Sequence, residues 1–135
     1  MSRASLITLS LLPLAIGACA SPETAARLEA ADEAKLARLL DGKTAGEPQK
    51  CLDLRDTSGS EPVGTTTVLY FQGRTTWRND LVGSCSGLRS HDTLITEQVG
   101  SRLCAGDFAR TADLRGAGGV TGSCVIGNFT PYRGG

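Results

Sequence analysis

The polar and apolar positions between Ser21 and about Asp41 are typical of one α-helix. Ala, Glu, Leu, Lys and Arg dominate this stretch, which holds no glycine and no β-branched residue after Thr24. Pro22 suits the first helical position, and Gly42 stands where a left-handed C-terminal cap is expected. The apolar stripe of leucines is thin. Two arrangements stay open: a stalk of roughly 30 Å, or a helix that lies on the following domain.

From about Lys50 to Tyr132 the apolar residues come in short runs separated by turn residues, a pattern typical of β-strands. The strongest hairpin signal has strands over 65–71 and 75–81 around Gln72-Gly73-Arg74. Further strands are predicted over 51–54, 93–99, 102–105, 108–114 and 123–126. No helical stretch separates them. We therefore predict a mainly β domain, a small antiparallel barrel or sandwich, preceded by one N-terminal helix.

Two segments between these elements read as irregular. Lys43 to Gln49 is interpreted as a linker, because Gly46 and Pro48 break any periodicity. The glycine-rich run over 116–122 is interpreted as a flexible loop.

Composition narrows the possible function classes. The 135 residues carry 14 basic and 14 acidic side chains, so the formal net charge is zero. A balanced chain lacks the strong positive field of a nucleic-acid-binding protein, and no nucleic-acid partner is expected. The length fits one small domain and is too short for a dehydrogenase or hydrolase scaffold of the doubly wound kind.

The first twenty residues are typical of an export signal. Arg3 precedes an apolar stretch over 6–16, and small residues follow it. The stretch is shorter than the roughly 20 apolar residues of a membrane-spanning helix, and Pro13 interrupts it. The sequence Ile16-Gly17-Ala18-Cys19 resembles the lipobox of bacterial lipoproteins, in which the cysteine sulfur takes a diacylglyceryl group before cleavage.

The lipobox resemblance implies that Cys19 becomes the lipidated first residue of the mature protein. Ala20 in place of aspartate then implies transport to the outer membrane, facing the periplasm. The alternative is an ordinary cleavage site at 18–20, which gives a soluble periplasmic or secreted protein beginning at Ser21. We expect a signal peptide over 1–18, a lipidated N-terminus with helical spacer and linker over 19–49, and a disulfide-bonded β domain over 50–135.

Once Cys19 is assigned to lipid, the five cysteines become an even set: Cys51, Cys85, Cys104 and Cys124. The intervals of 33, 18 and 19 residues are unlike the close spacing of a zinc site, and an oxidising envelope favours disulfides. We expect two disulfides and no bound metal or cofactor. Of the three possible connectivities, we favour Cys85 with Cys104, which ties the segment around 93–99. Cys51 with Cys124 would then join the first predicted strand to the last.

Three segments resemble catalytic or ligand-binding motifs, but the structural elements that such motifs require are not predicted around them. Gly83-Ser84-Cys85-Ser86-Gly87 mimics a nucleophile elbow, but no helical pattern follows it. His91 adjoins Asp92, yet neighbours in an extended chain point apart, so Asp92 is poorly placed to orient it. The glycine run over 116–122 lacks the lysine of a phosphate-binding loop. We expect no catalytic residue and no enzymatic activity.

Trp77, Arg78 and Asn79 are the best candidates for a binding surface. By alternation Trp77 shares one strand face with Asn79, while Arg78 faces the other way. Core packing is our main interpretation of Trp77, and an exposed binding platform is the alternative.

The pattern from Cys51 onward resembles a family of short, uncharacterised Gram-negative lipoproteins that share a domain of unknown function. The matching positions cover most of 51–131 and are Cys51-Leu52, Arg55, Leu69-Tyr70-Phe71, Gly73, Trp77-Arg78-Asn79, Leu81, Cys85, Gly87-Leu88, Arg102-Leu103-Cys104, Asp107, Cys124, Gly127, Phe129 and Pro131. The resemblance implies a cell-envelope location and a compact β domain. It supplies no known activity and no catalytic residue.

We therefore expect a lipid-anchored cell-envelope protein that binds or scaffolds an unknown envelope protein or ligand. The alternative is an envelope inhibitor of a lysozyme or protease. An inhibitor would need an exposed loop that enters an active cleft, and Ser86 to Asp92 is the candidate loop.

Overall fold

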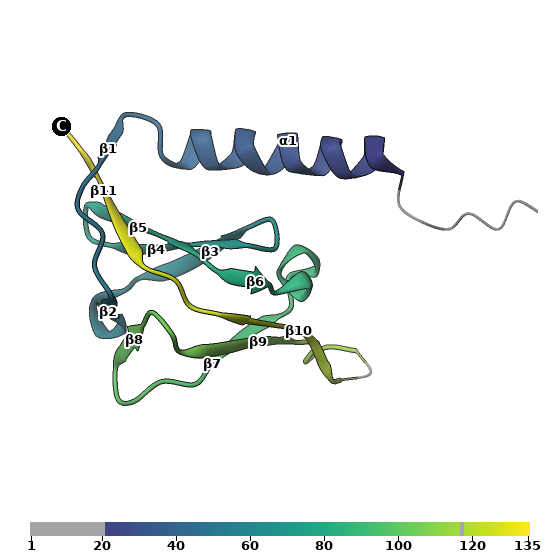
Figure 1. The fold of residues 1–135 in the computed structure, drawn as a ribbon. Helices are drawn as coiled ribbons and strands as arrows, with labels where there is room; N and C mark the ends of the chain where they lie inside the picture. Colours follow the sequence, from purple (N-terminus) through teal and green to yellow (C-terminus); the bar gives the residue numbers. More distant parts are fainter. Residues whose placement is uncertain (1–20, 117) are drawn as a thin grey trace, which may run out of the picture.

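The computed structural model describes residues 21–116 and 118–135. Within these residues the chain forms one α-helix, eleven β-strands and two short 3₁₀-helices (Figure 1). The predicted signal peptide over 1–18 and the predicted lipidation site Cys19 lie outside the described residues. None of the described helices has the length and apolar character needed to span a membrane.

Helix α1 spans Pro22–Leu39 and confirms the predicted helix. The Ser21 hydroxyl accepts a hydrogen bond from the backbone N–H of Thr24 at 3.3 Å, which satisfies one of the free donors of the first turn. At the other end Gly42 has a φ of +68°, a conformation that glycine adopts without steric cost. Pro22 occupies the first helical turn as predicted, whereas the C-cap is Leu40, and Gly42 belongs to the turn that follows, in which the Lys43 N–H donates to the Leu40 carbonyl at 3.1 Å.

The strands form three antiparallel sheets. The five-stranded sheet has the order β1 (Lys43–Ala45), β11 (Phe129–Gly134), β5 (Thr75–Asp80), β4 (Thr67–Gln72) and β3 (Gly59–Val63). The four-stranded sheet has the order β6 (Val82–Ser84), β10 (Val120–Val125), β9 (Phe108–Ala112) and β7 (Thr93–Thr96). The two-stranded sheet pairs β2 (Cys51–Asp53) with β8 (Arg102–Cys104).

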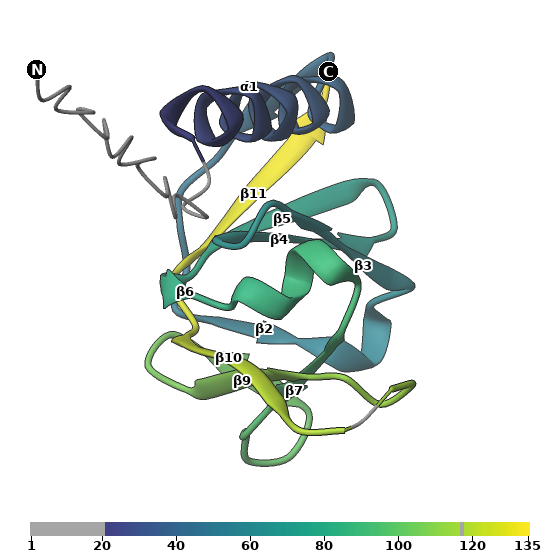
Figure 2. The same cartoon turned by 90° about the vertical axis from the view of Figure 1, so that its right-hand side faces the viewer.

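The two larger sheets face each other as a sandwich, and neither closes into a barrel. Figure 2 shows β2 and the 3₁₀-helix η2 (Ser86–Ser90) between them. The second 3₁₀-helix, η1 (Leu54–Asp56), follows β2 directly. The predicted fold class, a mainly β sandwich with two disulfides and one N-terminal helix, is confirmed.

The core lies between the sheets and follows from alternation along the strands. From the five-stranded sheet it takes Tyr70, Trp77 and Phe129, with the rings of Tyr70 and Phe129 edge to face at 5.9 Å between centroids. Leu52 and Leu103 enter from the two-stranded sheet and are fully buried. Burying side chains of this size stabilises the fold by about 1.5–3 kcal/mol each.

The hairpin of β4 and β5 confirms the strongest strand prediction. Gln72 pairs with Thr75, which leaves Gly73 and Arg74 as a two-residue turn, and Gly73 has a φ of +56°. A primed turn of this length needs such left-handed backbone.

Four strands were not predicted, each for a physical reason. The linker prediction for 43–49 is wrong over β1, which has no apolar alternation and forms because β11 offers it a hydrogen-bonding edge. Strands β3 and β11 each contain a proline, and β3 lies at a sheet edge, where proline is tolerated. Strand β6 has only three residues, all exposed. The flexible-loop prediction for 116–122 is wrong from Val120, where β10 begins.

All four predicted cysteines form disulfides, but the favoured pairing is wrong. The bridges join Cys51 to Cys104 and Cys85 to Cys124. The first predicted strand pairs with β8 rather than with a C-terminal strand, which places Cys51 opposite Cys104. Cys85 follows β6, whose partner β10 carries Cys124. Two such bridges are typical of proteins outside the cytoplasm, and each contributes about 4 kcal/mol in the chain-entropy estimate.

Burial of Tyr70 predicts a late alkaline transition. Removal from water disfavours the phenolate and raises the pKa of Tyr70 to about 12. Because the folded pKa lies above the unfolded value of about 10, this contribution to stability is complete below pH 10 and is lost as the pH rises towards 12. An ultraviolet titration should show one tyrosine ionising late, together with loss of near-ultraviolet circular dichroism. Tyr70→Phe should remove the late component, whereas persistence of that component would contradict the assignment.

Candidate functional site

Helix α1 rests on the five-stranded sheet through its second half only. Asp32, Lys35, Leu36, Leu39 and Leu40 are partly buried and recur at helical spacing, so they form one face. Every residue over 21–31 is exposed, and the helix extends past the sheet at this end (Figure 1). The sequence left open whether the helix is a free stalk or lies on the domain. In the structure its second half lies on the sheet and its first half projects beyond it.

Polar contacts hold the docked half. The guanidinium of Arg89 makes a bidentate pair with Asp32, at 2.6 and 3.2 Å. Lys35 donates to the carbonyl of Pro62 at 2.8 Å and forms a salt bridge with Glu61. No residue of α1 is fully buried. The helix is therefore held on the sheet by ion pairs together with three partly buried leucines, Leu36, Leu39 and Leu40.

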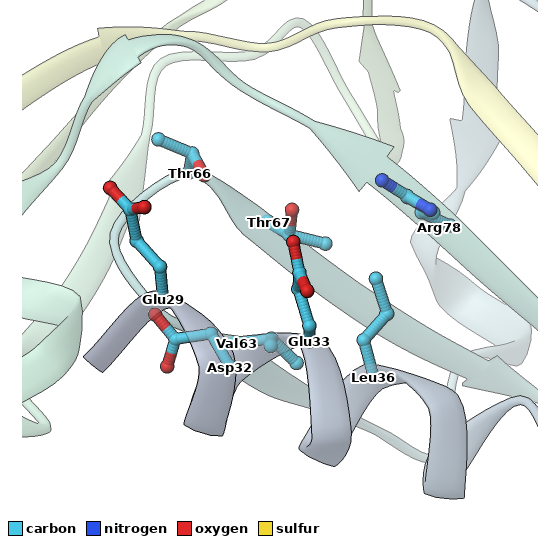
Figure 3. A pocket seen from close by; sticks show the side chains of 8 residues that line it. All are labelled: Glu29, Asp32, Glu33, Leu36, Val63, Thr66, Thr67 and Arg78. Atoms are coloured by element: carbon cyan, nitrogen blue, oxygen red, sulfur yellow. The ribbon is translucent and has the colours of Figure 1, made fainter. Parts of the chain in front are cut away.

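A cleft of about 240 Å³ lies between α1 and the sheet. Figure 3 shows carboxylates of α1 on one side and Arg78 of β5 on the other. Two apolar side chains and two threonine hydroxyls complete the lining. The lining residues are Glu29, Asp32, Glu33, Leu36, Val63, Thr66, Thr67 and Arg78. The cleft is thus acidic along the helix and apolar in part.

The charges of the cleft are unevenly neutralised. Asp32 is paired with Arg89, and Arg78 is paired with Asp80 at 2.9 Å. Among the described residues neither Glu29 nor Glu33 forms a salt bridge. Two carboxylates therefore face the cleft without a salt-bridge partner, across from Arg78 and beside Leu36 and Val63. This combination suits a cationic group carried on an apolar stem.

The structure separates the three predicted binding residues. Trp77 packs in the core, where its Nε1 donates to Gln72 Oε1 at 2.9 Å and the guanidinium of Arg133 lies 5.8 Å from the ring centroid. Asn79 is fully buried. Only Arg78 reaches the cleft. The alternation predicted along this strand is correct, and it assigns Trp77 to the core.

Asn79 stabilises the crossing from β10 to β11. Its side-chain amide donates to the carbonyl of Gly127 at 2.8 Å, and its oxygen accepts from the Gly127 backbone N–H at 3.2 Å. A Cβ on Gly127 would lie 2.0 Å from the carbonyl oxygen of Asp80. The role of Asn79 is therefore structural, and Gly127 must be a glycine for the two chains to approach.

The motif-like segments do not assemble a catalytic group. The Cys85 sulfur is held in a disulfide. His91 is exposed, while the Asp92 carboxylate accepts a hydrogen bond from Thr121 at 2.6 Å. Over residues 21–116 and 118–135, no group of three or more His, Cys, Asp or Glu side chains is arranged to hold a metal ion.

The segment Ser86 to Asp92 does not protrude as a free loop. Its first five residues form η2, in which Gly87 and Leu88 are buried. A Cβ on Gly87 would lie 2.1 Å from Thr121 Oγ1, so the segment is closely packed.

Sequence reasoning missed the acidic side of the cleft. Glu29, Asp32, Glu33 and Leu36 are spaced by three, four and seven residues, which places them on one helix face. This helical spacing could have indicated an acidic helix face. The spacing could not identify Arg78 on the opposite wall of the cleft, because Arg78 is distant in the sequence.

Comparisons of this chain with protein-family models, with curated proteins and with solved structures found no match.

Polar docking predicts that α1 can be released without unfolding the sandwich. In Asp32→Ala/Lys35→Ala, the backbone amides of 32–40 should exchange hydrogen faster, because both tethers are lost. The free energy of unfolding should fall by no more than about 2 kcal/mol, because each of the two partly exposed ion pairs contributes about 0.2–1 kcal/mol. Glu23→Ala/Arg27→Ala is the matched control, since it removes the exposed pair at the projecting end. Unchanged exchange over 32–40 in the first variant would contradict polar docking.

Proposed function

We propose that this chain is a lipid-anchored cell-envelope protein that binds a partner through the cleft beside α1. The observation that carries the proposal is the division of α1 into two halves. Residues 29–36, at the junction of the two halves, form the acidic wall of the cleft, and the projecting end continues from the predicted lipid-bearing Cys19. One helix thereby links a membrane anchor to a binding surface.

The proposed location rests on independent features. The lipobox at 16–19 and the family resemblance both favour a lipoprotein, and two disulfides are typical of an oxidising compartment. Each acyl methylene buried in the bilayer contributes about 0.8 kcal/mol, so several chains on one cysteine anchor a small domain stably. The exposed residues 22–28, which precede the cleft-lining Glu29, would then space the sandwich by about 10 Å.

The proposed partner is an envelope protein that presents a basic side chain. Glu29 and Glu33 supply negative charge that no salt bridge neutralises, in a cleft where three carboxylates outnumber the one cation Arg78, and Leu36 and Val63 supply apolar contact for the stem of a lysine or arginine. Thr66 and Thr67 add hydroxyls that can accept hydrogen bonds from such a side chain. A binding role needs no catalytic group.

Lipidation predicts a defined mature N-terminus. When the full chain is expressed in a Gram-negative host, intact-mass analysis of the detergent-extracted protein should find an acylated Cys19 as its first residue. Cys19→Ser should leave the signal uncleaved and remove the acyl mass. A mature protein that begins with a free Ser21 amine would refute the anchor and favour the soluble alternative.

Binding in the cleft predicts position-specific crosslinking. A photoreactive side chain at position 33 should capture a partner in living envelopes, whereas the same group at exposed Arg38 should not. In the captured pair, Glu29→Lys should reduce the yield at least about fivefold, because losing one charge contact costs about 1 kcal/mol. Equal yields at positions 33 and 38, or no effect of Glu29→Lys, would reject the cleft as the binding site.

A further inference from the structure

The two disulfides occupy different environments. Cys85 and Cys124 are 0% and 4% exposed and belong to the core cluster. Cys51 and Cys104 are only partly buried. The second pair lies on a two-stranded sheet whose alternate residues, Leu52 and Leu103, point into the core. Because side chains alternate along a strand, the Cys51–Cys104 bridge lies on the outward face.

The register of β2 and β8 holds this bridge on the partly exposed face of the strand pair. Cys51 and Cys104 are directly opposite, with 4.0 Å between their Cα atoms. The flanking pairs carry the ladder hydrogen bonds, from Ala105 N to Lys50 O at 2.7 Å and from Leu54 N to Ser101 O at 2.8 Å. The cysteines therefore form a non-hydrogen-bonded pair, in which neighbouring side chains approach most closely.

Cations dominate the groove in front of the bridge. Its lining consists of Gln49, Lys50, Cys51, Asp53, Arg55 and Arg102, which includes three cations and one carboxylate. The Arg55 guanidinium and backbone N–H hydrogen-bond Asp53, which holds the pKa of that carboxyl well below its usual range. The Asp53 carboxylate is therefore paired with Arg55. Among the described residues, Lys50 and Arg102 form no salt bridge.

One further carboxylate lies near Cys104. Asp107 Oδ2 accepts a hydrogen bond from the Cys104 backbone N–H at 2.7 Å. Asp107 is not part of the groove lining, whereas Cys51 is. The cationic side of the bridge is thus the side of Cys51.

We propose that Cys51–Cys104 is a thiol-exchange site, open to a protein dithiol in the folded state, and that Cys85–Cys124 is a permanent structural bridge. A thiolate of the dithiol attacks Cys51 Sγ, the Cys51–Cys104 bond breaks, and Cys104 leaves as a thiolate that takes a proton from water. The second thiol of the reductant then attacks its own bridging sulfur and expels Cys51. Two electrons pass to the protein, which gains two thiols, and the reductant becomes a disulfide.

The environment favours attack at this bridge in two ways. Nearby Lys and Arg side chains stabilise the thiolates that form, because opposite charge lowers a thiol pKa. They also attract an approaching thiolate along the groove. The Cys85–Cys124 bridge is buried in the core, and it continues to join the start of η2 to β10 when the outer bridge is open.

The test is timed reduction of the folded protein with dithiothreitol at neutral pH. Aliquots are quenched with iodoacetamide, and alkylated peptides are quantified by mass spectrometry. Cys51 and Cys104 should be alkylated at least about tenfold faster than Cys85 and Cys124, while the near-ultraviolet circular dichroism of Trp77 is retained. Equal rates for all four cysteines, faster reaction of Cys85, or alkylation only as the dichroism is lost would overturn the proposal.

Charge variants test the cationic groove separately. Lys50→Glu/Arg102→Glu should slow alkylation of Cys51 and Cys104 several-fold at low salt, and added salt should reduce the difference. Arg38→Glu, on the exposed side of α1, is the matched control and should react like the parent protein. Both exchanged residues are exposed, and circular dichroism checks that the variants fold. Reduction of the double variant at the parent rate would refute the electrostatic part of the proposal.

Discussion

Strand β5 is hydrogen-bonded on both edges, to β4 and to β11, and much of the structure depends on its register. A shift by one residue would exchange its two faces and break two ladders at once. In the observed register Trp77 and Asn79 point into the sandwich, and Arg78 points towards α1. The core, the crossing between the sheets and one wall of the cleft are therefore positioned by the same strand.

The features predicted correctly from the sequence are those with local causes. Pro22 suits the start of α1, Gly42 supplies the left-handed backbone of the turn after it, and Gly73 supplies the positive φ of the tight hairpin turn. Alternation along 75–81 identified Trp77 as a core residue, because a strand buried on one face allows only one orientation. Each of these inferences needs only a few consecutive residues.

The features that the sequence did not predict depend on contacts between distant segments. Pairing of the cysteines requires the strand order, and Cys51 lies opposite Cys104 because β2 pairs with β8 and not with its neighbours in the chain. Strand β1 has no alternation of apolar and polar residues, and it forms because the free edge of β11 supplies its hydrogen-bonding partners. The cleft likewise needs both α1 and β5, so neither wall alone indicates it.

The contacts of α1 with the sandwich set the free energy that holds the helix in place. No residue of α1 is fully buried, and each of its two partly exposed ion pairs with the sandwich contributes only about 0.2–1 kcal/mol. A partner shifts the position of the helix if its preference for the released form exceeds these contacts together with the packing of the partly buried leucines.

The contact between Asn79 and Gly127 defines how remote relatives of this chain can be recognised. The two residues are 48 positions apart, and exchange of either one disturbs the crossing, because the amide contacts two backbone groups and the glycine admits the carbonyl of Asp80. The disulfides, by contrast, join segments that strand pairing already brings together. We therefore expect relatives with this fold to keep an asparagine in the central strand and a glycine at the later sheet-to-sheet crossing, even where the cysteine spacing differs.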